Sequence, residues 1–183
     1  NLRSTGRYDA AGAVTFQERL LVELEGIPGV TSAALASQAP VLGAHGRSTV
    51  NPAERPERES GVEAEYVVVT PGYFETLGIP VLRGRTFLAR AEEPEPVVVV
   101  NEALARLFWR DQDPLGRQLV RGGSTFRVVG VVADVQMRSL RDRGRPGVYY
   151  LHHQQPMAPT ALAAHLRMAG PTAVAAEALR RAV

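Results

Sequence analysis

The sequence predicts an α+β fold, in which short helices alternate with strands. Three observations support this prediction. The segment 70–80 carries start and stop signals for a helix and lies between two strand-like runs. Four consecutive valines at 97–100 lead directly into Asn101 and a helical pattern. Two further strand-like runs flank the glycines at 122–123, a pattern typical of a hairpin turn.

The helix signals of the central segment are local and specific. Thr70 suits an N-cap, and Pro71 suits the first helical position, where a missing N–H costs nothing. Tyr73 and Leu77 are four residues apart and share one face. Gly78 can adopt the left-handed conformation that closes a helix. We therefore expect a short helix, capped at both ends, packed between strands.

An amphipathic helix and a strand of small residues open the fold. The helix is predicted over 13–25, because apolar residues recur at helical spacing: Phe16, Leu20, Leu24 and Ile27. A strand is predicted over 30–38. The glycine-containing loop over 40–47 predicts a first boundary between two lobes.

The remaining elements follow from the same kinds of signal. Asn101 is the predicted N-cap of a helix whose apolar stripe is Leu104, Leu107 and Phe108. Gly130 lies inside a strand pattern, so a bulge or a close backbone approach is expected there. A last helix begins at Pro171. Strands are predicted over 48–50, 62–69, 81–87, 96–100, 118–121, 125–135, 148–151 and 161–168.

Composition limits the classes of function. The chain has 183 residues, 45% of them hydrophobic, and can bury a core as one domain or two small lobes. It has no cysteine, so disulfides and thiolate chemistry are excluded. All 21 basic residues are arginine, yet the net charge is only +2, so we expect no nucleic-acid partner. No apolar run approaches the roughly 20 residues of a membrane helix. Since the chain starts at Asn1 and stops within a helical pattern, we expect a longer parent protein.

We predict no catalytic residue and no metal site. His152 and His153 are adjacent and would point to opposite faces of a strand, so with His165 they form a poor metal site. They are interpreted as surface or structural histidines. The sequence also assembles no nucleophile, base and orienting group in a known arrangement. The chain is therefore not expected to be an enzyme.

Two other patterns are given structural interpretations. Prolines interleave Glu92, Glu93 and Glu95, which indicates a solvated acidic loop, with a calcium site as the alternative. The glycines at 122–123 lack the Lys-Ser/Thr pair of a phosphate-binding loop, and no helix follows them. We therefore expect no cofactor.

One charge run is a candidate docking surface. It is the arginine loop, which we define by Arg138, Arg141, Arg143 and Arg145 around Asp142. The simplest interpretation is a solvated loop. The functional interpretation is a docking surface for an acidic partner protein or for lipid head groups.

Several motifs occur in a fixed order along about two thirds of the chain. They are V-T-P-G-Y-F-E-T-L-G-I-P at 69–80, L-R-G-R-T-F at 82–87, V-V-V-V-N-E-A-L-A-R-L-F-W at 97–109, D-P-L-G-R at 113–117 and F-R-V-V-G-V-V-A-D-V at 126–135. In these motifs the sequence resembles the MacB-like periplasmic core domain of FtsX-like permeases, which are subunits of ABC transporters. The motifs are turns, caps and core positions, so no catalytic residue is carried over.

The resemblance implies a two-lobed extracytoplasmic domain between two transmembrane helices. Residues 1–45 and 152–183 would form a discontinuous α/β lobe, truncated at its C-terminal end, and residues 46–151 an inserted strand-rich lobe. Such permeases export macrolides, peptides or toxins, move lipoproteins or activate cell-wall hydrolases.

The resemblance also implies partners and a location. The partners are a cytoplasmic ABC ATPase reached through membrane helices, a second permease copy and a periplasmic protein. The location is the extracytoplasmic, periplasmic face of the bacterial inner membrane. The expected role is non-enzymatic: transmission of conformational change and docking of partners or substrate. The alternatives are a soluble peptide- or lipid-binding domain and, from a third class, a hydrolase.

Overall fold

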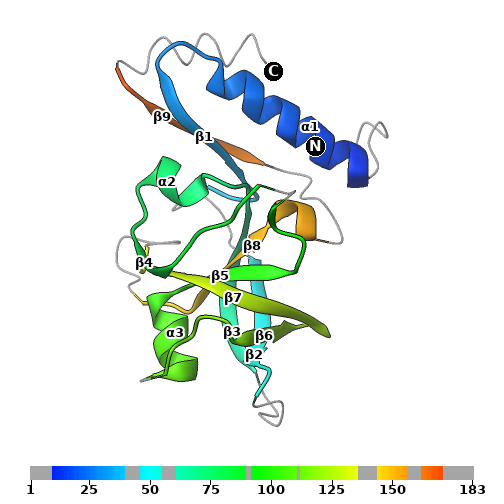
Figure 1. Cartoon of the computed structure of the whole chain (residues 1–183), viewed down its shortest axis with the longest axis vertical. Helices are drawn as coiled ribbons and strands as arrows, with labels where there is room; N and C mark the ends of the chain where they lie inside the picture. The colour runs from blue at the N-terminus through cyan, green and yellow to red at the C-terminus, as the bar shows by residue number, and fades with distance from the viewer. Residues whose placement is uncertain are drawn as a thin grey trace.

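The structure is a computed structural model that describes residues 10–39, 46–54, 61–89, 92–110, 112–135, 144–155 and 162–170. It has the predicted α+β fold (Figure 1). Its helices are α1 (Ala10–Glu25), α2 (Tyr73–Leu77) and α3 (Glu102–Trp109), with a short 3-10 helix, η2 (His152–Gln154). Its strands are β1 (Val30–Ala36), β2 (Gly46–Pro52), β3 (Val62–Val69), β4 (Val81–Gly84), β5 (Val97–Asn101), β6 (Gln118–Arg121), β7 (Ser124–Val132), β8 (Gly147–Leu151) and β9 (Ala163–Met168).

Six of the strands close into a barrel. Neighbours follow the order β2-β6-β7-β5-β8-β3, and β3 pairs again with β2. The closure depends on β2, whose residues Gly46–Val50 run antiparallel to β3 and whose Asn51 pairs with Val120 of β6. The predicted hairpin is confirmed as β6 and β7, joined at Gly122 and Gly123, both with positive φ. A closed ring leaves these strands without open edges.

Alternate residues of the strands enter two apolar cores. The barrel interior takes buried side chains from all six strands, and α3 adds Leu104, Phe108 and Trp109. The outer face of β3, β5, β7 and β8 is covered by α2 and by Phe87. Because both of their faces are covered, β5 and β8 are buried at every position. This explains why four consecutive valines form one strand.

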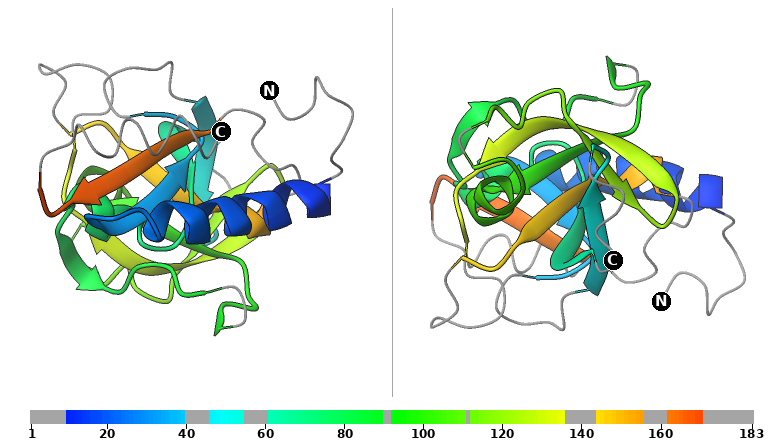
Figure 2. Two further views of the ribbon diagram at one scale, coloured as in Figure 1. Left: turned by 90° about the horizontal axis from the view of Figure 1, so that it is seen from above. Right: turned by 90° about the horizontal axis from the view of Figure 1, so that it is seen from below.

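Helix α1 and strands β1 and β9 lie together at one end of the molecule (Figures 1 and 2). β1 is antiparallel to β9, from Val30 opposite Met168 to Ala36 opposite Ala163. The predicted α1 stripe faces β1 through its buried residue Leu24, while Phe16 and Leu20 are half-buried. The division into lobes at residues 45–46 and 151–152 stays a prediction. The predicted helix after Pro171 lies outside the described residues.

The predicted start of α2 is wrong, and its predicted end is confirmed. α2 begins after Gly72, with φ of 81°, and no side chain caps it. The Thr70 hydroxyl instead accepts the backbone N–H of Leu35 at 2.9 Å, which ties β3 to β1. At the other end Gly78 has φ of 67°, and its N–H donates to the carbonyl of Glu75 at 3.0 Å.

Other boundaries differ because contacts distant in sequence override local pattern. Leu107 is 43% exposed and does not belong to the buried stripe of α3. β4 ends at Gly84 rather than at residue 87, and β7 ends at Val132 rather than at residue 135. β2 begins at Gly46, inside the predicted loop. The close approach predicted at Gly130 is confirmed, since a Cβ atom there would collide with the carbonyl oxygen of Arg85.

Candidate functional site

The arginine loop lies largely outside the described residues. This holds for Arg138, Arg141 and Arg143, so their docking role stays a prediction. Arg145 is described and exposed, and its carbonyl accepts the side-chain N–H of Asn101 at 2.7 Å. The end of the arginine loop is thereby attached to the start of α3.

Described residues on either side of the arginine loop contact the first turn of α3. The Asn101 side-chain oxygen accepts the N–H of Leu104 at 3.0 Å, which confirms the predicted cap, and also the N–H of Gly147 at 2.8 Å. Asp134, which precedes the loop, accepts the N–H of Ala103 at 2.8 Å. Two side chains far apart in the sequence thus satisfy two of the four free N–H groups of this helix end.

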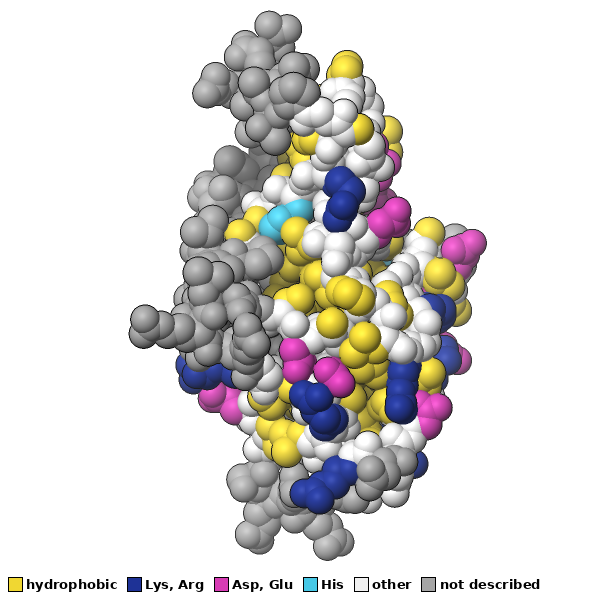
Figure 3. Space-filling model, turned by 90° about the vertical axis from the view of Figure 1, so that its left-hand side faces the viewer, with side chains coloured by type: hydrophobic (Ala, Val, Ile, Leu, Met, Phe, Trp, Pro, Cys, Tyr) yellow, Lys and Arg dark blue, Asp and Glu magenta, His cyan; other side chains and the backbone are white. Residues whose placement is uncertain are grey.

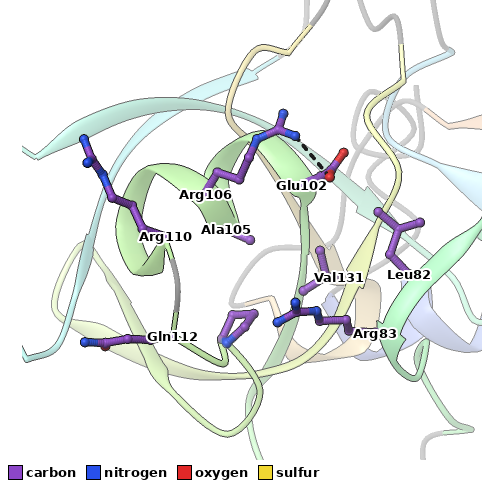
Figure 4. A pocket seen from close by; sticks show the side chains of 9 residues that line it. Leu82, Arg83, Glu102, Ala105, Arg106, Arg110, Gln112 and Val131 are labelled. Atoms are coloured by element: carbon purple, nitrogen blue, oxygen red, sulfur yellow. Dashed lines mark ion pairs between the residues drawn. The ribbon is translucent and has the colours of Figure 1, made fainter.

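A cleft of about 140 Å³ lies between α3 and β4 (Figure 4). Pockets that enclose small-molecule ligands usually measure about 300–1,000 Å³. The cleft therefore has room for a side chain or two rather than for a drug-sized ligand. Its lining residues are Leu82, Arg83, Glu102, Ala105, Arg106, Arg110, Gln112, Pro114 and Val131.

The charges around this cleft are unequal. Arg106 contacts two carboxylates, Glu102 at 3.1 Å and Asp134 at 3.1 Å. In the part of the chain that the structure describes, Arg83 and Arg110 have no ion pair. The side chain of Arg83 points into the cleft, whereas that of Arg110 points away from it (Figure 4). Arg83 therefore supplies an unbalanced positive charge inside the cleft.

Arg110 also has an unusual backbone conformation. Its φ of 40° makes it the one non-glycine residue with positive φ among those described. Such a conformation costs on the order of 1–3 kcal/mol. It ends α3 abruptly and directs the following residues, including Pro114, along the wall of the cleft.

The acidic loop is structural rather than fully solvated. Glu93 is buried and accepts two hydrogen bonds from the Arg85 guanidinium, at 2.5 and 2.8 Å. These bonds lower the pKa of the Glu93 carboxyl. Glu95 pairs with Arg127 at 3.0 Å. Gln154 joins the cluster by donating to the carbonyls of Glu93 and Glu95. The side chains of Glu93 and Glu95 are thus directed at arginines, not at a shared cation position.

The three predicted structural histidines lie on two elements. His152 and His153 are in η2, with ring centroids 5.1 Å apart, and His152 is buried. His165 is on β9 and contacts the ring of Tyr73 edge-on at 5.7 Å. Within the described ranges, no group of three His, Cys, Asp or Glu residues could hold a metal ion.

Sequence reasoning missed the cleft and the role of Asp134. Both depend on residues that are distant in sequence. The cleft lies between Arg83 on β4 and Ala105 on α3, and Asp134 accepts the N–H of Ala103. One signal was available for the cleft: Arg83 and Arg85 flank a glycine in an otherwise strand-like run, which is unusual for a strand buried on both faces.

The family model of the MacB-like periplasmic core domain matches residues 3–179. The chain belongs to this family. A 66-residue stretch is 30% identical to the macrolide export ATP-binding/permease protein MacB of Aggregatibacter actinomycetemcomitans. That stretch is 36% of this chain and 10% of that protein.

Solved structures of related domains share the fold of this family member. The periplasmic region of MacB from Actinobacillus actinomycetemcomitans superposes with a TM-score of 0.66, at 16% identity, over 90% of this chain and 71% of that one. The extracellular domain of the ABC-type transporter YknZ from Gram-positive bacteria gives a TM-score of 0.63, at 17% identity, over 91% of this chain and 81% of that one. Among the described residues of our MacB-like domain, no helix is long and apolar enough to cross a membrane.

Proposed function

We propose that this chain is the extracytoplasmic domain of an ABC-type permease. It transmits conformational change and docks partners or substrate, without catalysing a reaction itself. Its family, and the periplasmic and extracellular origin of the structures that share its fold, support this proposal. The partners are a cytoplasmic ATPase reached through membrane helices of the parent, a second permease copy and a periplasmic protein.

The observation that carries the proposal is the position of α2 between two groups of elements. On one side, the hydroxyls of Thr76 and Ser32 share a hydrogen bond, which connects α2 to β1. Arg167 of β9 donates to the carbonyl of Thr76 at 3.2 Å. On the other side, the Phe74 ring contacts Tyr149 of the barrel at a centroid distance of 4.8 Å. A displacement of β1 and β9 would therefore be passed to the barrel through packed side chains.

The test removes one of these contacts in the full-length parent permease with its ATPase. Arg167 is exposed, so Arg167→Ala takes away its hydrogen bond to α2 with little effect on folding. Since the aligned relative is a macrolide export protein, survival of cells in a macrolide measures transport. We expect roughly a tenfold loss of protection, within the usual range of coupling between sites. ATP hydrolysis by the purified complex should be retained.

The matched control is Arg47→Ala. Arg47 is also an exposed strand arginine, but its ion pair with Glu63, at 2.8 Å, joins two neighbouring barrel strands, β2 and β3, and does not reach α2. The control should protect cells as well as the wild type does. Full protection by Arg167→Ala, with a wild-type melting temperature, would contradict transmission through α2.

The soluble peptide- or lipid-binding domain remains the second candidate. A domain that encloses its ligand needs a cavity of several hundred cubic ångströms, and the α3–β4 cleft measures about 140 Å³. The size of this cleft favours contact with the surface of a partner over enclosure of a ligand. Saturable micromolar binding of a lipid to the chain, measured by calorimetry, would reverse this preference.

A further inference from the structure

Among the described strands, β4 lies at an edge of the sheet. In the described sheet it pairs with β7 alone, through Val81, Arg83 and Gly84. All four of its residues are exposed, and Leu82 is 48% exposed. Unpaired edges of this kind are templates for another strand, and they are usually shortened, charged or covered. The structure leaves this edge short but uncovered by any described element.

The open edge and the α3–β4 cleft share residues. Leu82 and Arg83 belong to β4 and also line the cleft. The other apolar residues that line the cleft are Ala105 of α3, Pro114, and Val131 of β7. A strand added along the free edge of β4 would bring its own alternating side chains beside Leu82 and beside the guanidinium of Arg83.

This part of the surface combines apolar and charged side chains. Figure 3 shows the side of the molecule on which α2, β4 and α3 lie in Figure 1. Hydrophobic side chains gather in the middle of this face, with basic and acidic side chains beside them (Figure 3). Binding surfaces of proteins commonly have this composition, an apolar centre with a polar rim.

We propose that β4 binds an extended segment of a partner protein by strand addition. A carboxylate of that segment faces Arg83, and an apolar side chain packs on Leu82. The inference rests on the proposed function, because it specifies where the domain docks a partner and by what chemistry. A guanidinium matches a carboxylate with two parallel hydrogen bonds, which gives the contact its specificity.

A second copy of this strand does not fit as the occupant. β4 consists of Val81, Leu82, Arg83 and Gly84 and contains no carboxylate. Two β4 strands paired with each other would bring their arginines close together, and like charges on neighbouring strands are destabilising. The occupant is therefore a different segment, one that carries an acidic residue.

The test selects ligands from a phage-displayed library of random nine-residue peptides on the 183-residue chain. We expect the selected peptides to combine β-branched residues with Asp or Glu. They are then synthesised with a fluorophore and titrated by anisotropy. Arg83→Gln should weaken their binding roughly 10- to 150-fold, the equivalent of hydrogen bonds to a charged group. Replacing the peptide's acid with its amide should have the same effect.

The matched control is Arg47→Gln, because Arg47 is also an exposed strand arginine but does not line the cleft. This variant should bind the peptides like the wild type. A charge exchange keeps the test independent of folding: Arg83→Glu should bind peptides in which lysine replaces the acid. The melting temperature of each variant is measured alongside.

Several results would overturn the proposal. These are a selection that enriches no peptide, peptides without an acid, or equal binding to the wild type and Arg83→Gln. A dimer of the chain that Arg83→Gln dissociates would identify a second copy as the occupant. Each result concerns β4 alone. Loss of protection in Arg167→Ala would still support transmission, so failure here is distinguishable from failure of the proposed function.

Discussion

At the scale of single residues, His165 has a perturbed imidazole. Burial lowers its pKa, against a smaller opposing effect from a backbone hydrogen bond with Gln38. Its Nε2 atom is buried and has no hydrogen-bond partner. The neutral imidazole therefore suits this position between β9 and α2, and a protonated ring does not.

We expect His165 to make the fold less stable in mild acid. Its pKa in the folded chain lies below the unfolded value of about 6.5, so the unfolded state binds more protons as pH falls through that value. The stabilisation by the neutral ring is fully present above a pH of about 6.5. It is lost as the pH falls through the lower pKa of the folded chain. The free energy of unfolding in urea should fall less from about pH 7.5 to 5.5 in His165→Phe than in the wild type. Parallel curves would contradict this assignment.

Gly78 requires the left-handed backbone conformation at the end of α2. Its φ of 67° excludes β-branched residues, and a Cβ atom would also displace the Arg167 guanidinium. We expect Gly78→Val to cost about 1–2 kcal/mol, equivalent to roughly 2–8 °C in melting temperature for a chain of this size. Gly170→Val is the control, because a Cβ there meets nothing within 4 Å. An unchanged melting temperature for Gly78→Val would refute the strain argument.

At the scale of elements, Asn101 holds three segments together. It ends β5, caps α3 and binds the chain on both sides of Pro146 through Arg145 and Gly147. Its side chain is buried, so its loss leaves the N–H groups of Leu104 and Gly147 without a partner and away from water.

We expect Asn101→Ala to cost about 2–3 kcal/mol, because it removes a cap and leaves the N–H of Gly147 unpaired. Asn101→Asp should cost less, since a carboxylate accepts the N–H of Leu104 and of Gly147 but cannot donate to Arg145. Urea denaturation of the three proteins measures the difference. Equal stability of Asn101→Ala and the wild type would show that these hydrogen bonds add nothing.

Local signals predicted the elements whose ends depend on local geometry. Gly78 and Asn101 act on neighbours within four residues, and the glycines at 122–123 set the turn of one hairpin. Thr70 carried an equally good local signal, yet its hydroxyl binds Leu35 on another strand. A hydroxyl can satisfy either partner, and packing of β3 on β1 decides between them.

The candidate site was less predictable than the fold, for the same reason. Asp134 caps α3 by accepting the N–H of Ala103, which lies 31 residues earlier in the sequence. The cleft unites β4 with α3, and the open edge of β4 follows from the strand order. None of these features follows from a periodic pattern of residues in the sequence. Each is set by how distant elements pack in the folded chain.

At the scale of the whole molecule, the arginine loop joins two described points that contact the start of α3, Asp134 before the loop and Arg145 at its end. If it docks on anionic lipid, each arginine contributes about 1 kcal/mol near the surface. We expect the wild-type chain to sediment with vesicles that contain phosphatidylglycerol, and a variant with all four loop arginines changed to glutamine to remain in solution.

The control for this experiment removes charge elsewhere on the molecule. Arg47, Arg117 and Arg127 form ion pairs on the barrel surface. Changing these three to glutamine should leave vesicle binding nearly intact. If the wild type does not bind vesicles, the lipid interpretation is wrong and an acidic protein is the partner to seek.

The pairing of β1 with β9 has a consequence for biosynthesis. Thr31 donates a hydrogen bond to the carbonyl of Arg167, 136 positions further along the chain. A ribosome that adds about 5–20 residues per second needs on the order of ten seconds to supply that partner. Throughout this interval β1 and the apolar stripe of α1 lack the strand that pairs with β1, because the ribosome is still synthesising the barrel. The nascent chain therefore exposes the apolar side of its first helix and strand until β9 has emerged.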